Sequence, residues 1–186
     1  MDRLRSLSTI LALLAFLACP DIARSETEET IQGFSVWQAY GGLQATAAET
    51  NTYSATIIGR LYVNTDKGPI DSGILSCPIM VRVMRDDRGQ SGSGTCTIST
   101  RDGGQVFLNL SCTGIYLVGC SGKATITGGS DRFKGITGNG TFTIRSDLAE
   151  PAAQQANNKP VKEPIGALPS DIGGILFFEA LSYKLP

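Results

Sequence analysis

The chain contains no histidine, and this absence excludes several classes of function. Histidine is the most frequent general base in enzymes and the commonest metal ligand in proteins. Serine-hydrolase triads, cysteine-protease dyads and histidine metal sites therefore each lack a required part. An excess of charge of one sign is also missing, because 16 Lys plus Arg stand against 17 Asp plus Glu. With no cluster of basic residues, we expect neither nucleic acid nor an anionic membrane as a partner.

Cofactor motifs and helical periodicity are lacking as well. No glycine-rich segment ends in a Lys-Ser/Thr pair and opens a helix, so a phosphate-binding loop is not predicted. We expect no cofactor and no metal. No window shows the 3.6-residue apolar repeat of an amphipathic helix. These absences leave a β-structure as the predicted fold class.

The N-terminus has the features of a secretory signal peptide. Two arginines precede an apolar run over residues 7–18, which is too short to be a transmembrane segment because a membrane span needs about 20 residues. Small residues predict cleavage after Ser25, giving a leader over 1–25 and one domain over 26–186. In a second interpretation, Cys19 is the lipidated residue of a bacterial lipobox. The protein is thus expected to be secreted or periplasmic, or alternatively lipid-anchored through Cys19.

Four cysteines remain after the leader and predict two disulfides, because thiols pair outside the reducing cytosol. Three connectivities exist. We favour Cys77–Cys96, whose members lie almost symmetrically about a turn at residues 86–89, together with Cys112–Cys120. The rival pairs Cys96 with Cys112 and leaves Cys77 for Cys120. Structural zinc has little support, since there is no Cys-x-x-Cys pair and no histidine.

The remaining sequence reads as short strands with apolar alternation, separated by turns. Residues 148–170 contain four prolines and little apolar surface, so we expect a flexible loop inserted within the domain. The apolar segment 175–185 then returns as a closing strand. We predict an all-β domain, a single antiparallel β-barrel of seven or eight strands. The clearest strand segments are 56–63, 74–85, 94–100, 105–112, 123–127, 140–145 and 175–185.

Five glycines lie within residues 128–140 and indicate a tight crossover between two strands. Phe133 and Ile136 are expected to hold the crossover onto the sheet. Asn139-Gly140 is typical of a two-residue hairpin turn. This segment predicts architecture rather than chemistry.

Several short phrases, together with this glycine segment, carry a resemblance to a known group. They are Gly59-Arg60-Leu61-Tyr62-Val63, Gly94-Thr95-Cys96, Gln105-Val106-Phe107 and the segment 128–140 itself. The segment resembles the Gly-Gly-x-Gly-x-Phe-x-Gly-x-x-Gly signature of allene oxide cyclase and dirigent proteins. Ser130-Asp131 replaces the usual Thr-Gly pair, and Asp tolerates the left-handed backbone better than most residues.

The resemblance to the allene oxide cyclase-like group implies a closed antiparallel barrel whose central cavity holds apolar or aromatic small molecules. Plant members are often trimers, so the resemblance leaves a homo-oligomer open. The plant cyclase uses a glutamate, an asparagine and bound water, and no local motif transfers these positions to this chain. A shared fold does not establish a shared function.

Three residues are candidates for a ligand site. Glu179 alternates with Ile175, Phe177, Leu181 and Tyr183, which places it either in a desolvated lumen or, if the other face is the core, in water. Arg82 shares a strand face with two methionines and either points to the same lumen or lies on an ordinary wet face. Trp37 either caps a barrel mouth or belongs to the core.

From these observations we expect an exported barrel that binds a small apolar or amphipathic ligand in its lumen. Glu179 and Arg82 would be the polar groups there. One alternative is an isomerase or cyclase in which Glu179, a weak catalytic candidate, moves a proton on a lipid-like or phenolic substrate. Another is a purely structural barrel whose interior is filled. The content of the lumen distinguishes these hypotheses.

Overall fold

A computed structural model describes residues 28–45, 50–84, 89–115, 118–146 and 172–185. The predicted signal peptide at residues 1–25, Cys19 and the predicted loop at residues 148–170 lie outside these ranges. Within the described part of the chain, no helix has the length and hydropathy needed to cross a membrane.

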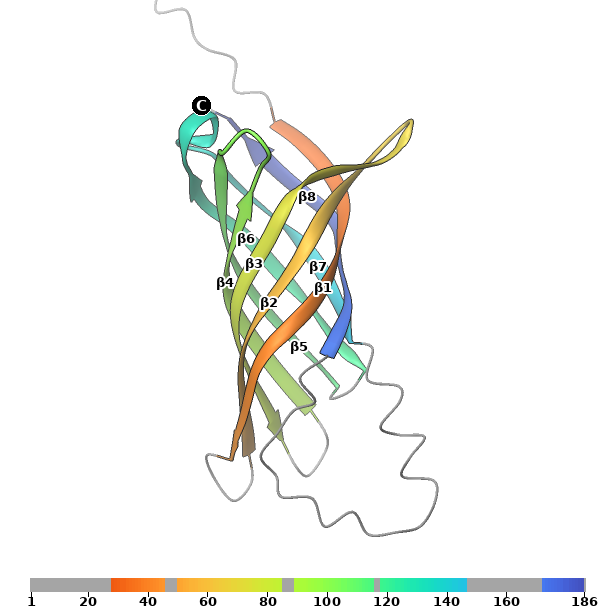
Figure 1. Ribbon diagram of the computed structural model, residues 1–186, viewed down its shortest axis with the longest axis vertical. Coiled ribbons are helices and arrows are strands. Elements are labelled where there is room, and N and C mark those ends of the chain that lie inside the picture. Colours follow the sequence, from red (N-terminus) through yellow and green to blue (C-terminus); the bar gives the residue numbers. More distant parts are fainter. Residues whose placement is uncertain (1–27, 46–49, 85–88, 116–117, 147–171, 186) are drawn as a thin grey trace, which may run out of the picture.

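Eight antiparallel strands form one closed barrel in which each strand pairs with its neighbours in sequence and β8 pairs with β1 (Figure 1). The prediction of an all-β barrel is confirmed. A short 3₁₀ turn, η1 (Asp131–Phe133), connects β6 to β7. The strands are β1 (Glu28–Ala45), β2 (Thr50–Thr65), β3 (Gly68–Met84), β4 (Gly89–Ser99), β5 (Gln105–Ile115), β6 (Gly119–Gly129), β7 (Thr137–Ser146) and β8 (Ile172–Lys184).

The barrel interior is apolar because alternate side chains of each strand point inward. On β3, Leu75 and Cys77 are buried while Ile74 and Met80 are exposed, as the alternation predicts. Val106, Leu108 and Leu110 follow the same rule on β5. Outward positions of β4 to β7 carry mainly Ser, Thr and Asn, such as Ser93, Thr95, Asn109, Thr113, Thr125 and Asn139.

The closing strand β8 confirms the prediction for residues 175–185, but its alternation does not continue unbroken. A β-bulge lies opposite Thr141 and Phe142 of β7, where Thr141 pairs with Ala180 and Phe142 pairs with Phe178. Glu179 is the extra residue, and it and Ala180 are both exposed. The inward phase therefore changes from Leu176 and Phe178 to Leu181. A bulge shifts the phase in this way because two residues occupy the space opposite one.

The glycine-rich crossover is held as predicted, but its turn lies elsewhere. Ile136 is buried and Phe133 packs against the core. Asp131 has φ of 52°, which agrees with the expectation that aspartate tolerates the left-handed backbone here. The predicted turn at Asn139-Gly140 is wrong, because both residues lie within β7 and pair with Thr125 and Ala124. The chain had already reversed through η1, so no second turn was needed.

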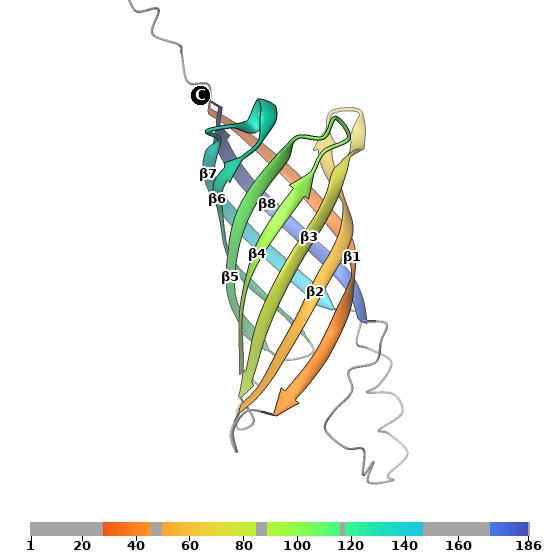
Figure 2. The ribbon, with the colours of Figure 1, turned by 60° about the vertical axis from the view of Figure 1, so that its left-hand side comes forward.

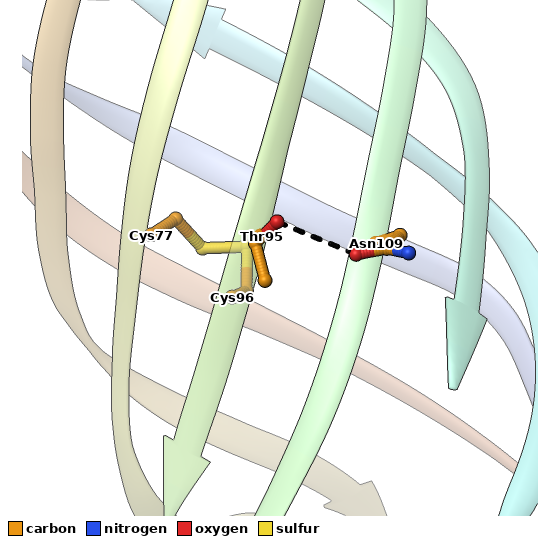
Figure 3. Close-up of a disulfide and its surroundings, with 4 residues drawn as sticks. All are labelled: Cys77, Thr95, Cys96 and Asn109. Carbon is orange, nitrogen blue, oxygen red and sulfur yellow. Dashed lines mark hydrogen bonds between the residues drawn. A yellow bond between two sulfur atoms is a disulfide. The ribbon is translucent and has the colours of Figure 1, made fainter. Parts of the chain in front are cut away.

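Both favoured disulfides are present. Cys77 of β3 and Cys96 of β4 join neighbouring strands with their Cα atoms 4.1 Å apart, and both are fully buried. Figure 3 shows that Thr95, which precedes Cys96 on β4, donates a hydrogen bond from its hydroxyl to the side chain of Asn109 on β5. Cys112 and Cys120 connect β5 to β6, with a Cα separation of 5.6 Å. The predicted turn between Cys77 and Cys96 lies mostly outside the described residues.

Candidate functional site

A cavity of about 720 Å³ opens at one end of the barrel. This end carries the β2–β3 hairpin, the β4–β5 turn and η1, and it lies at the top of Figure 1. Inward side chains from six strands and the crossover form an apolar wall. The wall includes Ile31, Leu61, Val63, Ile98, Val106, Ile126, Phe133, Ile136 and Leu181.

The wall exists because long strands extend the inward apolar alternation beyond the packed middle of the barrel. The middle is filled by fully buried side chains, namely Ile57, Leu75, Leu108, Leu176 and the Cys77–Cys96 disulfide. Towards the open end, the walls carry the same apolar residue types, but no further layer of side chains fills the space between them. The cavity is therefore an open apolar cup whose bottom is the packed core of the barrel. Figure 2 shows the surrounding strands from a second side.

Three arginines and two aspartates form a charged rim around this end of the barrel. Asp71 on β3 accepts hydrogen bonds from Arg60 and Arg101, each at 2.8 Å. Asp102 in the β4–β5 turn forms an ion pair with Arg132 of η1 at 3.0 Å. All of these residues except Arg60 contribute to the wall of the cavity itself. A ligand that enters an apolar cup therefore passes polar groups only at the opening.

The rim aspartates are held in their charged form. The hydrogen bond from Arg101 lowers the pKa of Asp71, and the positive charges of Arg101 and Arg60 act in the same direction. The hydroxyl of Thr100 donates to Asp102 and lowers the pKa of that carboxyl, with help from Arg132. Neither carboxylate is arranged to accept a proton near neutral pH.

One tyrosine also contributes a polar group to the wall, in addition to Ser72 and Thr100. The side chain of Tyr183 lines the cavity, and its hydroxyl donates a hydrogen bond to the carboxylate of Glu29. Burial and the neighbouring carboxylate raise the pKa of Tyr183 to about 12. The phenol is therefore neutral at physiological pH, and its proton is already engaged. It is suited to holding the wall in place rather than to proton transfer.

The structure places the two predicted polar groups of the lumen on the outside of the barrel. Glu179 lies on the outer face, where the hydroxyl of Thr143 donates to its carboxylate at 3.0 Å. Arg82 is exposed between Met80 and Met84 on the outer face of β3. The expectation that they share the lumen is wrong. The stated alternative holds for both residues. Leu176 and Phe178 form the inward face of β8, so Glu179 faces water with Ile175 and Phe177, and Arg82 lies on an ordinary wet face.

Trp37 belongs to the core. It lies in the middle of β1 and is 5% exposed, with its ring against Gly174, where no side chain could fit. The interpretation of Trp37 as a cap over the mouth is therefore wrong, and the core interpretation is correct. Phe133 of η1 lines the opening of the cavity instead. It is one of the two residues predicted to hold the glycine-rich crossover onto the sheet.

A second, much smaller cavity of about 50 Å³ lies beyond the packed middle. Its lining includes Ile57, Ile79, Leu110, Phe142 and the Cys112–Cys120 disulfide. Apolar cavities of this size stay dry. It has no room for an organic ligand.

None of the rim residues was predicted from the sequence as part of a ligand site. Arg101 and Asp102 lie in the β4–β5 turn, where charged residues are ordinary, and Asp71 lies near the start of β3. Their significance comes from closure of the barrel, which brings three separate turns to one end. Glu29 and Tyr183 are far apart in the chain and meet only because β1 pairs with β8.

Within the described ranges, no three Cys, Asp or Glu side chains gather in a way that could hold a metal ion. No carboxylate or cation among the described residues is buried, and Ser35 is the one buried polar residue there. The chain matches no protein-family model, and the search of curated proteins found no match either.

Proposed function

We propose that the protein binds a small apolar or amphipathic molecule in the cavity at the open end of its barrel. The observation that carries this proposal is the cavity of about 720 Å³, whose wall is apolar below a charged rim. Sites for small molecules typically measure about 300–1,000 Å³ and combine apolar walls with a few polar groups. An apolar portion would enter the cup, and a polar portion would remain at the rim beside Arg101 and Arg132.

Binding without chemical change is favoured over catalysis. The isomerase hypothesis assigned proton transfer to Glu179, and that carboxylate lies on the outer face, away from the cavity. The carboxylates that do reach the cavity are paired with arginines. A general base needs a pKa near the working pH, whereas these pairs hold the pKa values low.

Export and membership of the allene oxide cyclase-like group form part of the same proposal. The two disulfides fit an oxidising compartment outside the cytosol. The closed antiparallel barrel and the crossover through η1 fit the architecture that the resemblance implies. We therefore infer a secreted or periplasmic protein, with lipidation at Cys19 as the alternative.

A fluorescent apolar probe tests the binding site directly. Purified protein is titrated with N-phenyl-1-naphthylamine, whose emission rises when it leaves water. Val63 and Asn64 are neighbours on β2, but Val63 points into the cavity while Asn64 is exposed on the outer face. We expect Val63→Trp to fill the cup and weaken probe binding at least tenfold, and Asn64→Trp to bind as the wild type does. Equal binding by all three proteins would refute the site.

A further inference from the structure

The outer face of the barrel is apolar on one side and polar on the other. Exposed apolar side chains gather on β8, β1, β2 and β3, whereas β4 to β7 present mainly Ser, Thr and Asn. Val36 on β1 is 54% exposed and Phe177 on β8 is 42% exposed. We name this surface the apolar face, and it comprises Phe34, Val36, Tyr40, Ile58, Tyr62, Ile74, Ile175 and Phe177.

The centre of the apolar face is continuous because five of its members are cross-strand neighbours, namely Phe34, Val36, Tyr62, Ile175 and Phe177. Phe34 pairs with Phe177 on one side and with Tyr62 on the other. The rings of Phe34 and Tyr62 stack with centroids 5.2 Å apart, and Phe177 lies 6.4 Å from Phe34. Ile175 continues the surface beside Val36. Ordered aromatic rings of this kind are typical of the centre of a protein interface.

The apolar face has about the area that a stable interface needs. Each of these side chains leaves on the order of 60–100 Å² accessible, which gives roughly 500 Å² of apolar surface for the set. A standard interface buries about 800 Å² on each partner, of which slightly more than half is apolar. A contiguous exposed apolar patch of this extent is about as large as the largest patch on a typical monomer, and such patches are often functional.

Two opposite charges on either side of Phe34 make this face complementary to itself. Glu179 lies beyond Phe177 on β8, and Arg60 lies on β2 opposite Val36. By strand register, Phe34 lies midway between these two charges. Arg60 uses one nitrogen to bind Asp71 and is otherwise exposed. Among the described residues no lysine or arginine forms an ion pair with Glu179.

We propose that the apolar face binds a second copy of this chain, with a two-fold axis passing over Phe34. Such an axis exchanges the positions of the two charges, so that Glu179 of each copy meets Arg60 of the other. The aromatic cluster of one copy then packs on the aromatic cluster of its partner. The cavity wall lies outside this contact, because Arg60 is the one rim residue that does not line the cavity. The dimer and the proposed ligand site share only Arg60, and Val36, which belongs to the apolar face alone, allows the dimer to be tested without a change at the rim.

Two single charge reversals test the pairing in trans. In Glu179→Arg and in Arg60→Glu, each homodimer would place like charges together at two positions. When the two variants are mixed, every charge in the heterodimer meets its opposite. We expect sedimentation equilibrium to show that each variant alone dissociates at least tenfold more readily than the wild type. The equimolar mixture should return to the wild-type dissociation constant.

Controls separate this outcome from loss of fold. Far-ultraviolet circular dichroism of each variant should match the wild type. Val36→Lys places a charge at the centre of the apolar face and should give a monomer, whereas Thr125→Lys makes the same change on the polar side and should leave the dimer intact. A wild-type protein that stays monomeric at high micromolar concentration, or a mixture that fails to form the heterodimer, would overturn the proposal.

Discussion

At the scale of single residues, the charged rim connects stability to pH. Asp71 is held by Arg60 and Arg101, and its pKa in the folded protein lies below the ordinary value of 3.8. A carboxyl whose pKa falls on folding contributes stability above its unfolded pKa. That contribution is lost as the pH falls through the folded pKa. The rim is therefore expected to loosen only in strong acid.

Replacement of Asp71 by Asn tests this linkage. We expect Asp71→Asn to have a lower melting temperature than the wild type at neutral pH. The difference should shrink as the pH drops below 3.8, because the wild type then loses the same interaction. Asp66→Asn, in the exposed β2–β3 turn, serves as the control and should follow the wild type throughout. A difference that stays constant down to about pH 2 would contradict the assignment.

Ser35 offers a second test at this scale. Its hydroxyl is fully buried on β1, and no described residue forms a hydrogen bond with it. A buried polar group without a partner costs free energy. We expect Ser35→Ala to raise the free energy of unfolding by about 1 kcal/mol in urea denaturation. Ser54→Ala on the outer face should change it by less than about 0.5 kcal/mol. Destabilisation by Ser35→Ala would show that the hydroxyl is bonded.

At the scale of elements, the sequence predicted strands well wherever the inward face is apolar and the outward face is polar. β5 has this pattern, and Val106, Leu108 and Leu110 point inward as its alternation predicts. β1 was missed because apolar residues lie on both of its faces. Trp37 points inward beside Ser35, whereas Val36 and Tyr40 point outward. Such a strand has no apolar–polar alternation by which a single sequence could identify it.

The phase of β8 accounts for the main error about the site. Alternation placed Glu179 on one face with Phe177 and Leu181; Glu179 and Phe177 do share a face, but it is the outer one, and the bulge brings only Leu181 to the inner face. A bulge leaves no composition signal in a strand of large apolar residues. The charged rim was hidden for a different reason, because its members meet only through closure of the barrel. Local patterns thus predicted the elements, and long-range pairing determined the site.

The two disulfides differ in their contributions to stability. Cys77 and Cys96 are 19 residues apart and fully buried, whereas Cys112 and Cys120 are 8 apart at a hairpin. We expect the double variant Cys77→Ala/Cys96→Ala to lose roughly 3 kcal/mol or more, because the longer loop and the core packing both contribute. Cys112→Ala/Cys120→Ala should lose less. Guanidinium denaturation of both proteins gives the comparison, and the reverse order would contradict it.

At the scale of the whole molecule, the barrel has three separate surfaces: the cavity inside it, a polar outer side and an apolar outer side. Closure of the sheet and the alternation of side chains along each strand keep them apart. The inward phase builds a packed floor and an open apolar cup at one end. The outward phase is polar on β4 to β7 and apolar on β8 to β3. A ligand in the cup and a partner on the apolar face would therefore occupy separate parts of one molecule. Each can be removed by substitution without removing the other.

The cup as a binding site is tested most directly by native mass spectrometry of the protein purified from its own host. The account predicts a mass above that of the processed chain by one small organic molecule per protomer. This added mass should disappear in Val63→Trp and persist in Asn64→Trp. A bare chain mass for the wild type, together with no binding of an added apolar probe, would contradict it.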